Sequence, residues 1–305
     1  MTINKASLGE ISDVAEFLQS IFSLGTTTGT RCYRGEANST WELKPSIMRG
    51  LRKDAEKNII RELTLEVPDD FSNDRSMFSR LVRAQHYGLP TRLLDVSFNP
   101  LVALFFACYD ESESSNSADV IVMSFKNTRV KFADSDAVSI ISNLANLDDD
   151  EKEAIDQFIS DHVKRGIIYS EMRKAINELI QTDRLVHFVR AEKPYFRLNV
   201  DQHDFRKYYL VHPHKSNKRV IAQSGAFVLS GFMRYLNPDR NHSFSADRIR
   251  VPAQHKEKIL RQLDQLNINH RAMFPEIETA SKYIKRKWTK SSTDLNELLF
   301  GDVFG

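Results

Sequence analysis

The feature that most constrains this fold is a strongly apolar helix predicted over residues 101–109. Its nine residues, Leu-Val-Ala-Leu-Phe-Phe-Ala-Cys-Tyr, include no charged side chain. Asn99-Pro100 precedes it, and proline is favoured in the first turn of a helix. Because a helix that is apolar on nearly all sides must be buried, other elements have to cover it on all faces. A chain of 305 residues is long enough to build such a core without disulfides or metal.

The other predicted elements do not alternate regularly between strand and helix. Ser7 and Glu10 have the spacing of a capping box, so the first helix is predicted over 7–24. The other helices are predicted at 53–66, 74–87, within 135–182 and at 254–266. The strands are predicted at 31–35, 91–97, 119–125, 185–190, 195–200, 207–212, 223–229 and 247–251. This irregular order disfavours a doubly wound parallel sheet and predicts a mixed α+β fold.

The order of the predicted elements divides the chain into three parts. Residues 1–30 are expected to form an N-terminal helix and loop. Residues 31–251 are expected to form the α+β core, with a charged helical insertion at about 134–182. Residues 252–305 are expected to form a C-terminal helical region packed on that core.

Charge and cysteine content limit the classes of partner and compartment. The chain has 43 Lys plus Arg against 41 Asp plus Glu, so a nucleic-acid or membrane partner would need a local patch. The two cysteines, Cys32 and Cys108, form no C-x-x-C pair, and no structural metal site is expected. The N-terminus does not have the pattern of a secretory signal. These features predict a cytoplasmic protein.

The first candidate functional motif is Tyr33-Arg34-Gly35. An arginine at a strand end can bind a phosphate or carboxylate with its planar fork of donors. The neighbouring glycine would let a ligand approach the backbone closely. The alternative is a turn glycine beside an arginine that forms a surface ion pair.

The second and richer candidate is the segment from Gln85 to Ser97, which contains His, Tyr, Thr, Arg and Asp. Because side chains alternate along a strand, Asp95 and Ser97 should point into one cleft while Arg92 points away. Two structural alternatives stay open. His86 can be a satisfied core histidine, and Arg92 and Asp95 can form a buried ion pair.

The third candidate is Gln223-Ser224-Gly225. A side-chain amide both donates and accepts, which suits the recognition of a ribose or a base edge. The alternative is a β-bulge glycine with a polar neighbour. The nearby histidines at 203, 212 and 214 have no Cys or carboxylate at ligand spacing and are interpreted as strand and loop residues.

Taken together, these motifs resemble the FRG-domain family. The aromatic-Arg-Gly element is Tyr33-Arg34-Gly35-Glu36. The longest motif is Gln85-His-Tyr-Gly-Leu-Pro-Thr-Arg-Leu-Leu-Asp95, followed by residues 99–107. Arg219 with Gln223-Ser-Gly-Ala-Phe227 is similar to the third motif, and Met273-Phe-Pro-Glu-Ile277 to the closing one. The resemblance covers roughly residues 20–285. It does not by itself supply a mechanism.

The layout also resembles that of ADP-ribosyltransferases. That likeness implies a mostly antiparallel, split sheet flanked by helices, with NAD as substrate and no metal. An Arg-Gly strand comes first, then a strand bearing Ser that runs into an Ala-x-x-Phe-like helix. Gln223 stands where that class has its catalytic Glu. A glutamine cannot act as a carboxylate, so either Asp95 serves or the site binds a nucleotide without this chemistry.

This second resemblance implies roles for individual residues. The catalytic group would be drawn from Asp95, Gln223 and His86. Tyrosine would stack on the nicotinamide, arginine would contact phosphate or ribose, and the glycine backbone would hold the amide. The residues expected to bind NAD are Tyr33, Arg34, Gly35, Tyr87, Arg92 and Ser97.

The functional hypothesis is an NAD-dependent ADP-ribosyltransferase that acts as an intracellular toxin or antiphage effector. An RNA or DNA acceptor would be held by the basic loop Lys215–Arg219 and the basic tail Lys282–Lys290, whose alternative interpretation is a solvated charged surface. An antitoxin protein is a possible further partner, and no membrane partner is expected. Two alternatives stay open. One is a non-catalytic module that senses a nucleotide or a partner, and the other is a hydrolase or nuclease that uses His86 and Asp95.

Overall fold

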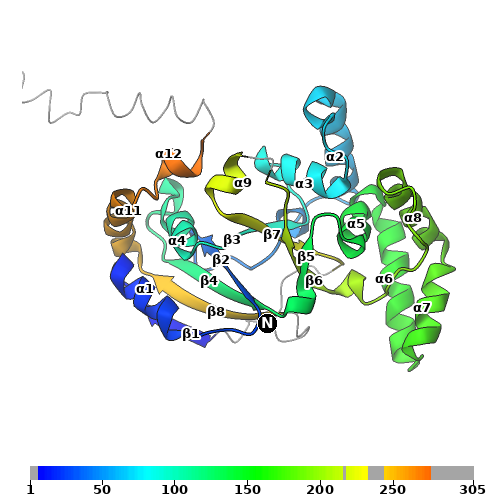
Figure 1. The fold of residues 1–305 in the computed structure, drawn as a ribbon, viewed down its shortest axis with the longest axis horizontal. Helices are drawn as coiled ribbons and strands as arrows, with labels where there is room; N and C mark the ends of the chain where they lie inside the picture. Colours follow the sequence, from blue (N-terminus) through cyan, green and yellow to red (C-terminus); the bar gives the residue numbers. More distant parts are fainter. Residues whose placement is uncertain (1–5, 216–217, 233–243, 276–305) are drawn as a thin grey trace, which may run out of the picture.

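The computed structural model describes residues 6–215, 218–232 and 244–275, and one mixed sheet runs through all three ranges (Figure 1). In these ranges the sheet has eight strands in the order β1-β8-β4-β2-β3-β7-β6-β5. The strands are β1 Ala6–Glu10, β2 Thr30–Glu36, β3 Leu93–Ser97, β4 Ala118–Phe125, β5 Val130–Phe132, β6 Tyr208–His212, β7 Gly225–Ser230 and β8 Phe244–Val251. The predicted α+β class with a mostly antiparallel sheet is confirmed.

The sheet consists of two halves that meet at a single residue pair. All neighbouring strands run antiparallel except the two outermost pairs, β1 with β8 and β5 with β6. Strand β2 pairs with β4 over seven residues, whereas its described pairing with β3 is limited to Tyr33 opposite Ser97. The strands on either side of this junction therefore diverge soon after they meet.

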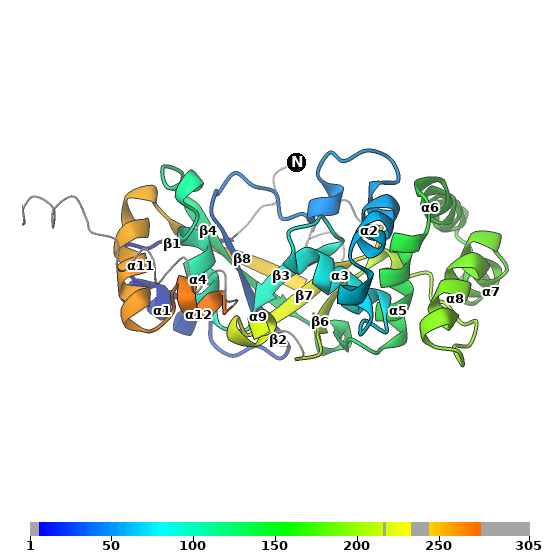
Figure 2. The same ribbon diagram turned by 90° about the horizontal axis from the view of Figure 1, so that it is seen from above.

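Helices cover both halves of the sheet. Figure 1 and Figure 2 show α1, α4 and α11 at one end of the molecule and α5 to α8 at the other. The α-helices are α1 Val14–Ser23, α2 Ala55–Glu66, α3 Met77–His86, α4 Pro100–Cys108, α5 Asp136–Asn143, α6 Asp149–Lys164, α7 Tyr169–Asn177, α8 Ile180–Glu192, α9 Lys218–Ala222, α11 Lys256–Gln265 and α12 His270–Met273. The 3₁₀ helices are η1 Ser46–Met48, η2 Pro68–Phe71, η3 Glu111–Glu113, η4 Asn127–Arg129, η5 Leu144–Asn146, η6 Asp204–Arg206 and η7 Ala253–His255.

The apolar helix α4 lies on the half of the sheet that contains β2, as its composition requires. Leu104 is fully buried, and α4 shares a core cluster with α1, α11 and the strands β4 and β8. Asn99 caps the helix by accepting a hydrogen bond from Leu101 N at 3.0 Å. The helix thus begins one residue earlier than predicted, at Pro100.

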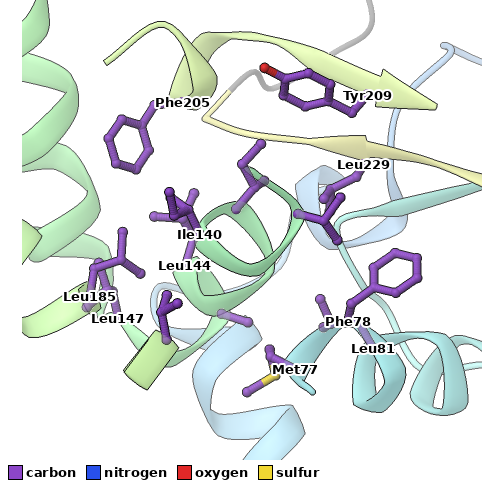
Figure 3. Packing of buried hydrophobic residues seen from close by; sticks show 14 of the residues in the cluster. Met77, Phe78, Leu81, Ile140, Leu144, Leu147, Leu185, Phe205, Tyr209 and Leu229 are labelled. Atoms are coloured by element: carbon purple, nitrogen blue, oxygen red, sulfur yellow. The ribbon is translucent and has the colours of Figure 1, made fainter. Parts of the chain in front are cut away.

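The other half of the sheet is covered by α3 and by the helical insertion. Figure 3 shows Phe78 and Leu81 of α3 near Leu229 of β7, with Ile140 of α5 and Leu144 of η5 beside them. The side chains of this cluster are almost completely buried. The two helix layers therefore sit on the same side of the sheet but on different halves, on either side of the β2–β3 junction.

On the opposite face of the sheet, side chains of distant strands pack against one another. Tyr208 of β6 meets Phe244 of β8 edge-on, with ring centroids 5.8 Å apart, although four strands separate β6 from β8 in the sheet order. Phe125 stacks on Phe244 in the same cluster. The sheet is therefore bent so that its two halves share one apolar core on their back face.

Two predictions about the N-terminal segment are wrong. The first helix begins at Val14, because Asp13 rather than Ser7 caps it by accepting from Glu16 N. Residues 6–10 instead form β1, which pairs with β8. Their partner lies more than two hundred residues away, so no local pattern indicated this strand.

The predicted strands at 185–190 and 195–200 are also wrong. Residues 185–190 lie in α8, where Leu185, Val186 and Val189 form the buried face of a helix. The four-helix segment α5–α8 therefore runs on to Glu192, past the predicted end at 182. Residues 195–200 form neither strand nor helix. The proposed domain boundaries stay a prediction, and no helix of the described residues has the length and apolar character needed to cross a membrane.

Candidate functional site

A cavity of about 290 Å³ opens at the junction of the two sheet halves, between α3 and α4. Its polar lining comes from β2, β3, α3 and α9, and also includes Asp110 after α4 and Gln223 after α9. Its apolar lining comes from α4, the loop after β2, β7 and single residues of α3, β3 and α9. Seven of the nine predicted site residues line it, namely Tyr33, Arg34, Gly35, His86, Asp95, Ser97 and Gln223. The structure thus brings together three motifs that are far apart in the sequence.

Asp95 is the exposed residue of an otherwise buried strand. Leu93, Leu94, Val96 and Ser97 of β3 are all buried, whereas Asp95 is exposed. Diverging strands leave open space above it, so a carboxylate in the middle of the sheet faces the cavity rather than the core. The Asp95 side chain is therefore accessible to a ligand in the cavity.

A two-step hydrogen-bond relay orients that carboxylate. Gln85 Nε2 donates to Asp95 Oδ2 at 2.6 Å. The hydroxyl of Thr91, which is fully buried, donates to Gln85 Oε1 and so fixes which end of the amide faces Asp95. Gln85 and Thr91 belong to the long motif, but neither was predicted to have a role in the site. The only local signal was that Gln85 directly precedes His86 and that Thr91 lies four residues before Asp95.

Arg34 ties the two sheet halves together at the cavity. Its Nη1 donates to the backbone carbonyl of Asp95 at 2.9 Å, where the diverging strands leave that carbonyl without a partner on β2. Its Nε lies 3.5 Å from a carboxylate oxygen of Glu36, whose side chain is fully buried. Arg248 lies 3.6 Å from the other oxygen of Glu36. The Arg34 guanidinium is therefore held by the buried carboxylate of Glu36, and the Arg34 side chain is 18% exposed.

Gly35 lines the cavity and also allows α4 to pack closely against β2. A side chain here would place its Cβ 2.1 Å from Ala103 O and 2.5 Å from Ala107 N. The missing side chain is thus required because the backbone of α4 packs directly against β2. The close approach of a ligand to this backbone stays a prediction.

The side chains of Ser97 and Gln223 both form hydrogen bonds within the protein. Ser97 Oγ donates to Gln223 O at 2.7 Å and accepts from Asn99 N at 2.9 Å. The Gln223 amide donates to Met273 O at 3.0 Å, which ties α9 to α12. Gln223 lies just before β7 rather than on it, and Ser224 has a positive φ of 47°. The hydroxyl of Ser97 has one acceptor position left for a ligand.

Aromatic side chains form the cavity walls. Trp41, Phe106 and Tyr109 line it together with Tyr33, and burial raises the pKa of Tyr33. Arg219 forms part of the opposite wall, with its guanidinium 4.4 Å from the centroid of the Phe274 ring. Arg219 Nη1 also donates to His86 O at 3.2 Å, which joins α9 to the end of α3. A flat ring between such walls would gain stacking contacts on both faces.

Two predicted binding residues lie outside the cavity. Arg92 lies directly before β3 and is buried, and it donates to both oxygens of Glu56 at 2.7 and 2.5 Å. The buried ion pair considered from the sequence therefore exists, but its acid is Glu56 and not Asp95. Tyr87 is 59% exposed at the end of α3 and meets the His86 ring edge-on, so it is not part of the lining.

The fold and the site together define an α+β protein with an aromatic-walled polar cavity at the junction of a divided sheet. Residues 30–116 match the family model of the FRG domain, and the chain thus contains an FRG domain, as the motifs predicted. The match covers Arg34, Asp95 and α4 but ends before Gln223. Searches of the curated proteins and of the solved structures found no match.

Several predicted features lie partly or wholly outside the described residues. The tail Lys282–Lys290 and the end of the segment Met273–Ile277 are outside them, and so are residues 216–217 of the basic loop. Within the described ranges there is no group of three or more His, Cys, Asp or Glu side chains arranged to hold a metal ion. The site is therefore described by the cavity and its lining alone.

Proposed function

We propose that the cavity binds NAD and that the protein transfers ADP-ribose to an acceptor. In this reaction the bond between nicotinamide and ribose C1′ breaks, and its electron pair leaves with nicotinamide. A nucleophilic atom of the acceptor forms the new bond to C1′, and its proton is released. Nicotinamide is a good leaving group, so positioning and charge stabilisation supply most of the rate.

The observation that carries this proposal is the exposed carboxylate of Asp95 between aromatic walls. The transition state of such a transfer carries positive charge on the ribose ring, and a fixed carboxylate beside it stabilises that charge. Asp95 is also placed to accept the proton of the acceptor nucleophile. Since the Gln223 amide is tied to Met273, Asp95 is the better choice for the acid of the reaction.

The size and charges of the cavity support one orientation of the dinucleotide. A volume of 290 Å³ is at the small end of ligand pockets, which span roughly 300–1,000 Å³. It suits the nicotinamide riboside part between Tyr33 and the aromatic wall, with the adenosine part outside. Arg34 and Arg219 stand on different elements of the lining, where a guanidinium would pair with pyrophosphate oxygens.

The second candidate function is a module that senses a nucleotide without reacting with it. The amide at Gln223 and its bond to Met273 favour it, because binding at this position would move α9 and α12 rather than assist chemistry. Both functions require the same cavity, but they differ in the role of Asp95.

Labelled NAD separates the two functions. The protein is incubated with NAD and cell lysate, and nicotinamide release and label on RNA, DNA and protein are measured together with the melting temperature. Transfer predicts release and labelling by the wild type, with loss of both in Asp95→Asn while the NAD-induced rise in melting temperature persists. A sensor predicts the rise without release. If NAD neither raises the melting temperature nor yields free nicotinamide, the cavity does not bind NAD, and both the transferase and the NAD-sensor proposals are wrong.

The role as a toxin or antiphage effector is part of the same proposal, and expression in a bacterial host tests it. Wild type should slow growth, whereas Asp95→Asn should not, at equal levels of folded protein. If expression of wild type and expression of Asp95→Asn both leave growth unchanged, the toxin role loses its support.

A further inference from the structure

The one-turn helix α12 and the residue that follows it lie against the wall of the cavity without lining it. Figure 1 and Figure 2 show α12 beside α9 and close to α4. Met273 and Phe274 are buried and belong to the same core cluster as α4. Neither is among the residues that line the cavity. They can therefore act on the site only through the residues they contact.

The chain turns back after α11, and this turn brings α12 to α4. Asn267 has a positive φ of 59°, and asparagine adopts this left-handed conformation more readily than most residues. Ile268 N donates to Leu263 O at 2.9 Å, which closes the end of α11. Asn269 then caps α12 by accepting from Ala272 N at 2.9 Å. Two asparagines thus determine where the segment turns and where the next helix begins.

Phe274 belongs to a cluster of rings that connects α12 to α4. Its ring meets Phe106 edge-on, with centroids 5.9 Å apart, and lies 5.6 Å from the Tyr109 ring. His270 packs on the same ring at 4.7 Å. Phe106 and Tyr109 both line the cavity. The ring of Phe274 is therefore fixed from the side of α4.

Arg219 of α9 contacts the ring of Phe274 and also the end of α3. Its guanidinium carbon lies 4.4 Å from the centroid of the Phe274 ring, and Nη1 donates to His86 O at 3.2 Å. The Gln223 amide donates to Met273 O at 3.0 Å, which is a second contact between the α9 segment and α12. The guanidinium thus joins α3, which covers one half of the sheet, to α12, which packs on the other half.

Stacking on a ring fixes the plane of a guanidinium without occupying its N–H groups. The contact with the ring is made through the face of the group. The five donors point outward in its plane, where they bind the oxygens of a phosphate. A guanidinium that is already oriented loses less conformational freedom when it binds an anion. Because Arg219 lines the cavity, this orientation bears directly on the ligand.

We infer that Phe274 is a positioning residue that orients Arg219 toward the phosphate groups of the ligand. The ring holds the plane of the guanidinium, and the bond from Gln223 to Met273 O keeps α9 close enough for the stacking. That the ligand is NAD rests on the proposed function, whereas the positioning requires only a ligand with phosphate groups. The first two residues of the motif Met273-Phe-Pro-Glu-Ile277 thereby acquire a role in the site.

Binding of ADP-ribose, the group transferred in the proposed reaction, tests this role without any chemical step. Calorimetry measures the affinity for ADP-ribose and for nicotinamide riboside, which has no phosphate. Phe274→Leu keeps an apolar side chain in the core but removes the ring face, and it should weaken ADP-ribose binding by about fivefold. Phe274→Tyr keeps the ring and should bind close to wild type. Nicotinamide riboside should bind to all three proteins with the same affinity.

A double-mutant cycle separates positioning from a general loss of structure. Arg219→Gln should weaken ADP-ribose binding by about tenfold, because a charged donor to the phosphate is lost. When Arg219 is already replaced, Phe274→Leu should have no further effect, since the ring acts through the guanidinium alone. All variants are compared at a temperature where their melting curves show folded protein.

Two matched controls change the same residue types outside the cavity lining. Phe22→Leu removes a ring that is 75% exposed on α1, and Arg271→Gln removes an exposed cation from α12 itself. Both should bind ADP-ribose like wild type.

Several outcomes would overturn the inference. It is wrong if wild type does not bind ADP-ribose, or if Phe274→Leu binds it as tightly as wild type. It is also wrong if nicotinamide riboside loses the same factor in affinity, or if the effects of Phe274→Leu and Arg219→Gln are fully additive. If the expected ADP-ribose affinities are found but no transfer from NAD occurs, the transferase proposal fails and the positioning by Phe274 stands.

Discussion

Tyr33 faces Ser97 at the one described position where β2 pairs with β3 and the two sheet halves join. Beyond it the strands separate, and Arg34 supplies to the Asp95 carbonyl the hydrogen bond that a neighbouring strand would otherwise provide. The separation also leaves the Asp95 side chain open to the cavity. One junction therefore explains both the position of the site and the need for an arginine beside it.

The first prediction concerns the relay that orients Asp95. Thr91→Val removes the hydroxyl that fixes the Gln85 amide while keeping the shape of the side chain. We expect nicotinamide release to fall by about tenfold, the effect of losing roughly one hydrogen bond of positioning. Thr91→Ser keeps the hydroxyl and should stay close to wild type. Equal activity of the two variants would show that the relay does not position Asp95.

The second prediction concerns Arg34 as the tie between the sheet halves. Arg34→Ala leaves the Asp95 carbonyl unpaired and takes one counter-charge from the buried Glu36. A hydrogen bond from a charged donor contributes about 1.5–3 kcal/mol, so urea unfolding should show a loss of that order. The NAD-induced melting shift should also disappear. Arg34→Lys is the control, and a wild-type unfolding midpoint in Arg34→Ala would contradict the role.

The third prediction separates two glycines of the site. Gly35→Ala forces a Cβ to within 2.1 Å of Ala103 O, where the obstacle is the backbone of α4. We expect a loss of at least about 1–3 kcal/mol in thermal or urea unfolding. In Gly225→Ala the nearest atom is 3.3 Å away, and the loss should be small. Comparable stability of the two variants would show that α4 can shift away from β2.

The fourth prediction is that Arg92 stabilises the fold without binding the ligand. Arg92→Met leaves Glu56 buried with Lys152 as its remaining described ion-pair partner. Removing one member of a buried pair costs about 3–5 kcal/mol. The NAD-induced melting shift should survive at temperatures where the variant is folded. Loss of the NAD-induced melting shift in folded Arg92→Met would show that Arg92 contributes to ligand binding.

The fifth prediction is a pH dependence that comes from Glu56. Burial works to raise its pKa, but Arg92 and Lys152 outweigh burial, and the pKa lies below its ordinary value of 4.5. As the pH falls, Glu56 is therefore protonated in the unfolded chain before it is protonated in the folded one. The stabilisation by this carboxylate is present above about pH 4.5 and is lost as the pH falls through the lowered pKa. Glu56→Gln should be less stable than wild type at pH 7.

The measurement is urea unfolding of both proteins from pH 7 to pH 3. The difference in unfolding free energy between wild type and Glu56→Gln should shrink below about pH 4.5. A difference that stays constant over the whole range would show that the charge of Glu56 does not contribute.

Local pattern was sufficient where neighbours in the sequence determine the structure. The apolar composition of 101–109 predicted the burial of α4, and the strand alternation around Asp95 correctly separated it from Arg92. Short-range signals of this kind depend on side-chain periodicity, which a single segment carries in full.

Pairing between distant segments was not visible in the sequence. It decided that residues 6–10 form β1, that 185–190 are helical against α5, and that Arg92 binds Glu56. It also decided that Gly35 is needed for α4.

For this chain, the sequence alone determined the α+β class, the FRG motifs and the residues that gather around Tyr33-Arg34-Gly35 and Asp95. Only the tertiary structure decided that the sheet divides between β2 and β3, which exposes Asp95 and assigns its orientation to Gln85 and Thr91. The physical reason is that hydrogen-bond register and burial are properties of segment pairs, and a linear pattern does not record which segments meet.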